Sequence, residues 1–168
     1  MGRRLLLGAC AVGLVHAGFS LYWALGGWWL LNTVGQWAVQ WAEQAPVAAR
    51  LALTGVAAVK IAGAAVPLLV DAGRLPWRRF WRTVSALGAG VLIVYGAGNT
   101  LVAWAVLSGL ITVAGGFDPA AQLGHAALWD PLFFLWGALL AAGLWATRRR
   151  DSAATAATTR GVEALNEA

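Results

Sequence analysis

The sequence predicts an all-α integral membrane protein, a four-helix bundle with a short interfacial amphipathic helix between its first and second spans. Hydrophobic residues make up 60% of the 168 residues and charged residues only 11%, whereas a soluble domain carries about 25% charged residues. The apolar residues form four runs, each near the roughly 20 residues that a helix needs to cross a bilayer. These spans are expected at about 5–25, 47–70, 84–113 and 131–147.

The segment between the first two spans has the pattern of a helix lying flat on the membrane. It follows the glycine pair at 26–27, which favours a turn. On a helix, one narrow face of this segment would carry Leu30, Val34, Trp37 and Trp41, and the opposite face would carry amides and Glu43. Tryptophan at the head-group level is typical of such helices. We therefore expect a surface helix from Leu30 to Gln44.

The other connections combine basic, aromatic and helix-starting residues. Asp71 to Thr83 is expected to be a loop in which four arginines alternate with aromatic side chains. Such a mixture can indicate nucleic-acid binding, but between two spans it favours anchoring to lipid head groups, so no nucleic-acid partner is expected. Asp-Pro pairs at 118–119 and 130–131 predict helix starts, with a short helix from Pro119 to about Leu128 before the fourth span.

The arginines predict the orientation of the chain. They precede the first span, separate the second from the third and follow the fourth, while the other two connections lack such clusters. By the positive-inside rule, both termini are expected in the cytoplasm. Residues 148–168 are expected to be a basic stop and a disordered cytoplasmic tail. The bias toward Arg, Ala, Gly and Trp suggests a GC-rich bacterial genome, and hence the inner cell membrane.

Lys60 is the most informative residue because it is the one charge at the centre of the second span. A charge at that depth costs several kcal/mol and usually faces the bundle interior. The alternative is that its side chain extends to the membrane surface. That surface is roughly 18 Å away at 1.5 Å per residue, farther than a lysine reaches comfortably, so an inward Lys60 is favoured.

The other spans offer polar-capable groups at the same depth. His16, Tyr95 and Trp136 each lie roughly 16 Å from the basic end of their spans, and Asn99 follows Tyr95 by one turn. Each is also a common core residue, but together they predict a central ligand-binding layer of His16, Lys60, Tyr95, Asn99 and Trp136. Since no carboxylate shares that depth, Lys60 is expected either to be uncharged or to face an anionic or carbonyl-bearing ligand.

A second polar group is predicted near the outer face, where the first span ends and the fourth begins. Its members are Ser20, Tyr22, Trp23, His125, Trp129 and Asp130. A histidine and an aspartate among tryptophans could serve as an acid/base pair for a lipophilic substrate. The plainer reading, which we favour, is that Asp130 caps a helix and the tryptophans form an aromatic belt. The pattern contains no metal or cofactor site and no catalytic motif, so catalytic residues stay unknown.

Two stretches resemble a family of small bacterial membrane proteins, catalogued as domain of unknown function 3995. The first runs from Phe19 through Tyr22-Trp23-Ala24-Leu25-Gly26-Gly27, with His16 just before it, and the second is Leu128 to Gly137, with Trp129-Asp130-Pro131 at its start. The resemblance covers all four spans and implies a four-span protein. It implies no activity, so no functional residue is carried over.

Three functions fit the sequence, and they do not decide whether the protein is an enzyme. The first is a bundle that binds a small lipophilic molecule through the central layer. The second is an accessory subunit that packs against a larger membrane protein or a second copy of itself. The third is a small oligomeric transporter, although transporters usually show internal repeats with broken helices. The lipid bilayer is a partner in all three.

Overall fold

The protein is an integral membrane four-helix bundle in the computed structural model, which describes residues 1–112 and 116–166, with side chains only up to 148 in the second range. Four helical segments are long and apolar enough to cross a membrane, which confirms the predicted fold class. The elements are α1 (Gly2–Ala24), η1 (Leu31–Thr33), α2 (Gln36–Gln44), α3 (Pro46–Asp71), α4 (Arg78–Leu107), α5 (Pro119–Gly124), η2 (His125–Trp129) and α6 (Asp130–Asn166).

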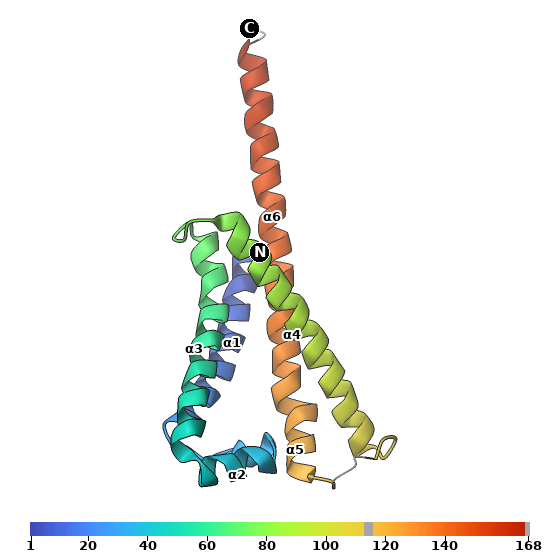
Figure 1. Cartoon of the computed structure of the whole chain (residues 1–168). Helices are drawn as coiled ribbons and strands as arrows, with labels where there is room; N and C mark the ends of the chain where they lie inside the picture. Colours follow the sequence, from blue (N-terminus) through green and yellow to red (C-terminus); the bar gives the residue numbers. More distant parts are fainter. Residues whose placement is uncertain (113–115, 167–168) are drawn as a thin grey trace.

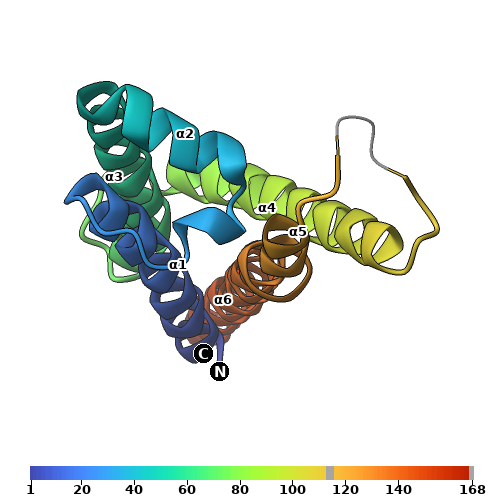
Figure 2. The ribbon, with the colours of Figure 1, turned by 90° about the horizontal axis from the view of Figure 1, so that it is seen from below.

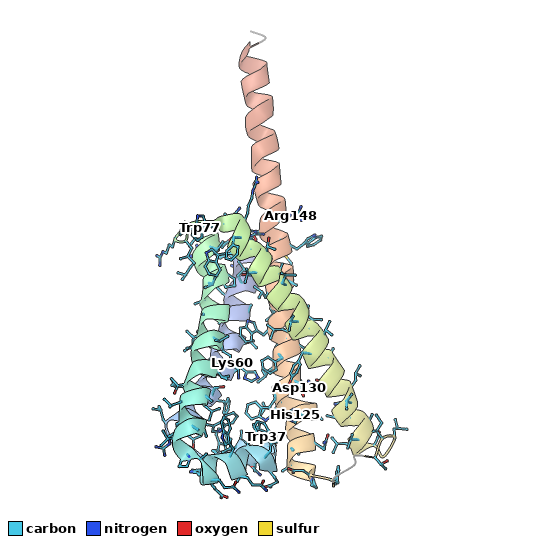
Figure 3. All side chains as sticks on the ribbon, in the orientation of Figure 1. Trp37, Lys60, Trp77, His125, Asp130 and Arg148 are labelled. Carbon is cyan, nitrogen blue, oxygen red and sulfur yellow. The ribbon has the colours of Figure 1, made fainter. Side chains whose placement is uncertain are left out.

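The helices pack as two pairs joined along one side (Figure 1). α1 packs extensively on α3, α4 on α6, and α1 on α6, whereas α3 and α4 touch far less. Figures 1 and 2 show α3 and α4 close together at their connecting turn and diverging toward α2. We call the end with that turn and Arg148 the Arg-rich end, and the opposite end the α2 end (Figure 3).

The surface segment between α1 and α3 is shorter than predicted. Gly35 adopts φ +135°, a conformation that side chains disfavour, and it separates the single turn η1 from α2. The break disrupts the single face proposed for Leu30 to Gln44. Trp37 and Trp41 point outward from α2, while Ala38 is buried. Figure 1 shows α2 at one end of the bundle, roughly perpendicular to the long helices. A helix that does not span the membrane was predicted here, but its bounds are Gln36–Gln44 and not Leu30 to Gln44.

α4 begins and ends six residues earlier than the predicted third span of 84–113. The loop expected from Asp71 to Thr83 is a turn of residues 72–77, and its last arginines already belong to the helix. Arg82 donates a 3.0 Å hydrogen bond to Thr147 Oγ1, so this part of α4 is held against α6 rather than free in a loop. At the other end, Gly109 takes φ +76° and stops the helix. Val113 lies outside the described residues.

The short helix predicted at Pro119 continues into the fourth span without a break in helical structure. Asp118 caps α5 by accepting from Ala121 N at 3.1 Å, as the Asp-Pro pattern predicted. The second Asp-Pro pair, Asp130-Pro131, does not start a separate helix, because the π-helical turn η2 leads directly into α6. A proline ring clashes with the carbonyl four residues earlier in a regular helix, and a wider π turn before Pro131 relieves that clash. The division into a bundle and a tail from 148 stays a prediction.

Two apolar clusters fill the bundle. One, centred on Trp136, joins α1, α3, α4 and α6 toward the Arg-rich end, and the other, centred on Trp23 and Trp129, lies under η1 and α2. Close helix contact depends on small residues. A Cβ on Gly96 of α4 would come within 2.6 Å of the Asp130 carbonyl oxygen, so the backbones of α4 and α6 are in direct contact there. The candidate site lies between the two clusters.

Candidate functional site

The central polar layer, as observed, consists of Lys60 on α3 with His16 and Ser20 on α1. Lys60 Nζ lies 3.0 Å from His16 Nδ1 and donates a 2.8 Å hydrogen bond to Ser20 Oγ. His16 and Ser20 are one turn apart, so they project from one face of α1, and they are only 4% and 1% exposed. Lys60, at mid-height in Figure 3, therefore points into the bundle. Ser20 was assigned to the outer group by sequence; the structure moves it to this layer.

The layer carries more hydrogen-bond donors than acceptors. A protonated Lys60 has three N–H groups and no acceptor, so His16 Nδ1 must accept from it and a neutral His16 carries its proton on Nε2. That Nε2 is buried near the backbone of Trp129 but has no partner at hydrogen-bond geometry among the described residues. No carboxylate of the described part of the chain lies within ion-pair distance of Lys60.

Phe133 on α6 completes the layer, and the sequence analysis did not single it out. Its ring centroid lies 4.0 Å from that of His16 and 5.5 Å from Lys60 Nζ, so the ring face offers the ammonium a cation–π contact. Phe133 is three residues before Trp136, a spacing that puts both rings on one face of α6. That spacing was a usable signal, although an aromatic residue in an apolar helix is normally only packing.

Tyr95 and Asn99 lie beside the layer without bonding to Lys60. The Tyr95 ring packs edge-on against Phe133 with centroids 5.6 Å apart, and its hydroxyl interacts with the Asn99 side chain. Tyr95 is half exposed, and no hydrogen bond links it or Asn99 to Lys60 within the described residues. The structure thus places Phe133 beside both Tyr95 on α4 and Lys60 on α3.

Trp136 lies one turn from the layer toward the Arg-rich end. Its ring is wedged against α1 at Gly13, where an added Cβ would come within 2.6 Å of it, and against α3 at Gly63 and Ala64. The side chain is 4% exposed, yet its Nε1 has no hydrogen-bond partner among the described residues. The centre of the bundle therefore contains a second buried N–H group without an acceptor.

The outer group is brought together around His125 and Asp130, which we call the outer dyad. His125 Nδ1 lies 2.9 Å from Asp130 Oδ2, and its Nε2 lies 3.2 Å from the Val34 carbonyl. Asp130 is 1% exposed. The π turn η2 places the two side chains together although they are five residues apart. Both ring nitrogens are occupied, so the dyad has no nitrogen available for the acid/base role considered above.

The tryptophans around the dyad fasten η1 to the fourth span. Trp129 Nε1 donates to the Thr33 side chain at 3.0 Å, and its ring packs edge-on against Trp23 at 5.3 Å. Trp23 Nε1 in turn donates to the Trp29 carbonyl at 2.9 Å. Tyr22 lies apart from the dyad, where its hydroxyl accepts from Trp29 N at 3.4 Å. Among the described residues, the donors of this region are matched by acceptors, as in a structural clasp.

Donor chemistry limits what the central layer can hold. No group of three or more His, Cys, Asp or Glu side chains in the described ranges lies close enough together to hold a metal ion. The layer instead presents an ammonium, an imidazole N–H and an indole N–H among aromatic rings. Such a set suits an oxygen acceptor carried on an apolar molecule.

The comparisons with known proteins concern the whole bundle. The model of a family described as "Protein of unknown function (DUF3995)" matches residues 13–140. This range includes every residue of the central layer and the outer dyad. No curated protein and no solved structure matches the chain.

Proposed function

Because the chain belongs to the DUF3995 family of unknown function, we propose its activity from the site alone: it binds a small lipophilic molecule through the central polar layer. The observation that carries the proposal is Lys60, held at mid-span by His16 and Ser20. A cation at the bilayer centre costs several kcal/mol and is normally paired. Here its neighbours are neutral, so the structure keeps a costly charge that a bound molecule would compensate.

The position of the layer supports entry from the side of the bundle. α3 and α4 diverge away from their connecting turn (Figure 1) and pack little on each other. Lys60 and Phe133 are partly exposed and Tyr95 is half exposed, which supports access to the layer from the surrounding bilayer. A molecule dissolved in the bilayer would reach it without crossing water.

Native mass spectrometry in mild detergent tests the proposal. We expect the wild-type protein to retain a lipophilic molecule and Lys60→Met to lose it. Arg74→Gln is the matched control, since it removes one exposed cation from the turn between α3 and α4, and it should retain the molecule. A wild-type protein without any bound molecule, or equal retention by Lys60→Met, would contradict the proposal.

An accessory role is the second candidate, because α4 leaves much of its surface unpacked. Only 11% of the most apolar stretch of α4 is buried in the protein. Cβ atoms added at Gly88, Gly90 or Gly98 would meet nothing within 4 Å. Small residues on an open face allow another helix to approach closely. Cysteine crosslinking from Gly98→Cys in native membranes should trap a partner or a second copy if this role holds, and only the monomer if it does not.

We extend the proposal to location: a multi-pass protein of a bacterial inner membrane with the Arg-rich end in the cytoplasm. Its support is the positive-inside rule together with Figure 3, where Arg148 lies at the same end as Trp77, the residue just before Arg78 and Arg79. Alkaline phosphatase fused after Ala168 should be inactive, and a fusion within 109–112 should be active. The reverse result would invert the orientation.

A further inference from the structure

We infer that the ligand of the central layer is an amphiphile whose head group is a singly charged oxygen anion, such as a carboxylate or a phosphodiester. This inference rests on the proposed function and names its ligand class. It follows from a count of donors, acceptors and charges in the layer and the residues packed on it.

The first step is the hydrogen-bond balance. With Lys60 protonated, its contacts use His16 Nδ1 and Ser20 Oγ as acceptors. His16 Nε2–H and Trp136 Nε1–H then remain buried without an acceptor among the described residues. A buried donor without a partner costs about 1–3 kcal/mol, so two of them on the packed helices α1 and α6 are unusual for a site that only holds the fold. An oxygen acceptor is what this arrangement lacks.

The second step is the charge. Within the described residues, the nearest groups to Lys60 are a histidine, a serine and an aromatic ring, and none carries a negative charge. One oxygen anion would neutralise the ammonium and accept from it in a charge-assisted hydrogen bond, the stronger class of such bonds. A neutral alcohol would meet the hydrogen-bond requirement but leave the charge. An amine would add a second positive charge, and like charges repel at close range.

The third step is the apolar part of the ligand. Phe133 and Tyr95 pack edge-on beside Lys60, and Val91, one turn before Tyr95 on the same face of α4, is exposed. An acyl chain lying along this side would cover apolar surface while its head group meets the layer. The site therefore selects by head-group charge and tolerates variation in the chain.

Binding to four amphiphiles with similar chains tests the inference: oleate, dioleoylphosphatidylglycerol, oleyl alcohol and oleylamine, each added to detergent-solubilised protein and measured by native mass spectrometry. Oleate, the phosphatidylglycerol or both should bind about tenfold or more tightly than the alcohol and the amine, since only they make the charge-assisted bond. The stronger of the two anions distinguishes a free carboxylate from a lipid phosphodiester. Lys60→Met should remove the preference, and Arg74→Gln should keep it.

Trp136→Phe serves as a second variant because it keeps Lys60 and removes one unpaired donor. It should weaken binding of the anions and of the alcohol severalfold, since both would accept from the indole N–H, and it should keep the preference for the anions, which depends on Lys60. Equal binding of alcohol and anions, or preferential binding of the amine, would overturn the inference and leave the proposed function standing. Failure of all four amphiphiles to bind would also overturn the inference, whereas the proposed function is decided by the retention test on the wild-type protein and Lys60→Met.

Discussion

The central layer, centred on α1 and α3, and the outer dyad, formed by η2 and α6, are two polar groups that differ in how completely their hydrogen bonds are made. At the dyad, His125 uses both ring nitrogens and Trp129 uses its indole N–H. In the central layer, His16 Nε2 and Trp136 Nε1 have no partner among the described residues. A fully bonded network rigidifies a fold, whereas an incomplete one is costly. On this difference we propose a stabilising role for the dyad and a binding role for the layer.

The largest effect is expected from Asp130→Ala. Removing one partner of a buried ion pair costs about 3–5 kcal/mol, and since His125 is one-third exposed we expect about 2–3 kcal/mol here. The free energy of unfolding would be measured in mixed micelles. Glu43→Ala on the exposed face of α2 is the control and should change little. Similar stability of the two variants would remove the structural role from the dyad.

A smaller loss of stability is expected from Gly96→Ala. The added Cβ would meet the backbone of α6 at Asp130 and Phe134, and overpacking of this kind costs about 1–3 kcal/mol. It would also move Tyr95 away from Phe133 and so weaken binding. Gly98→Ala, where the Cβ meets nothing within 4 Å, is the matched control on the same helix. Equal effects at both positions would show that α4 is not held at Gly96.

The sequence was sufficient for the number of spans and for the proximity of Lys60 to His16. These features follow from apolar run length and from the helix rise, which act locally along the chain. The third span was misplaced because Arg78, Arg79 and Arg82 suggested a loop. In the structure Arg82 reaches Thr147 on another helix, a tertiary contact that composition does not encode.

Most residues of the site were identified from the sequence, but which of them contact one another was not. Ser20 was placed with the outer group because it lies near the end of the first span, yet it faces Lys60 because it is one turn from His16. Phe133 was missed because its one signal, the three-residue spacing from Trp136, is also what ordinary packing of an apolar span produces. The partnership of His125 with Asp130 depends on the π turn at η2, which no residue pattern announced.

Two tryptophans on the fourth span test the comparison directly. Trp129→Phe and Trp136→Phe remove the same atoms from side chains that are 3% and 4% exposed, so the loss of apolar area is matched. Only Trp129 also loses hydrogen bonds, those to Thr33. We expect its variant to be less stable than the Trp136 variant by about 1 kcal/mol, the usual value of one such bond. Equal stabilities measured by the same unfolding method would mean that the Thr33 contact contributes nothing.

The smallest effect on stability is expected from Lys60→Met, the change with the largest expected effect on binding. Breaking a buried ion pair is destabilising because it leaves a charge alone, but Lys60 has no charged partner among the described residues. Methionine has similar length and no desolvation cost, and apolar replacement of buried polar groups is often neutral or stabilising. His16 and Ser20 each lose one hydrogen bond, worth about 1 kcal/mol apiece, and these losses offset much of that gain. We therefore expect the ligand-free variant to unfold within about 1 kcal/mol of the wild type, in contrast to Asp130→Ala. A loss as large as that of Asp130→Ala would make the layer a structural element like the dyad, and the distinction between the two regions would fail.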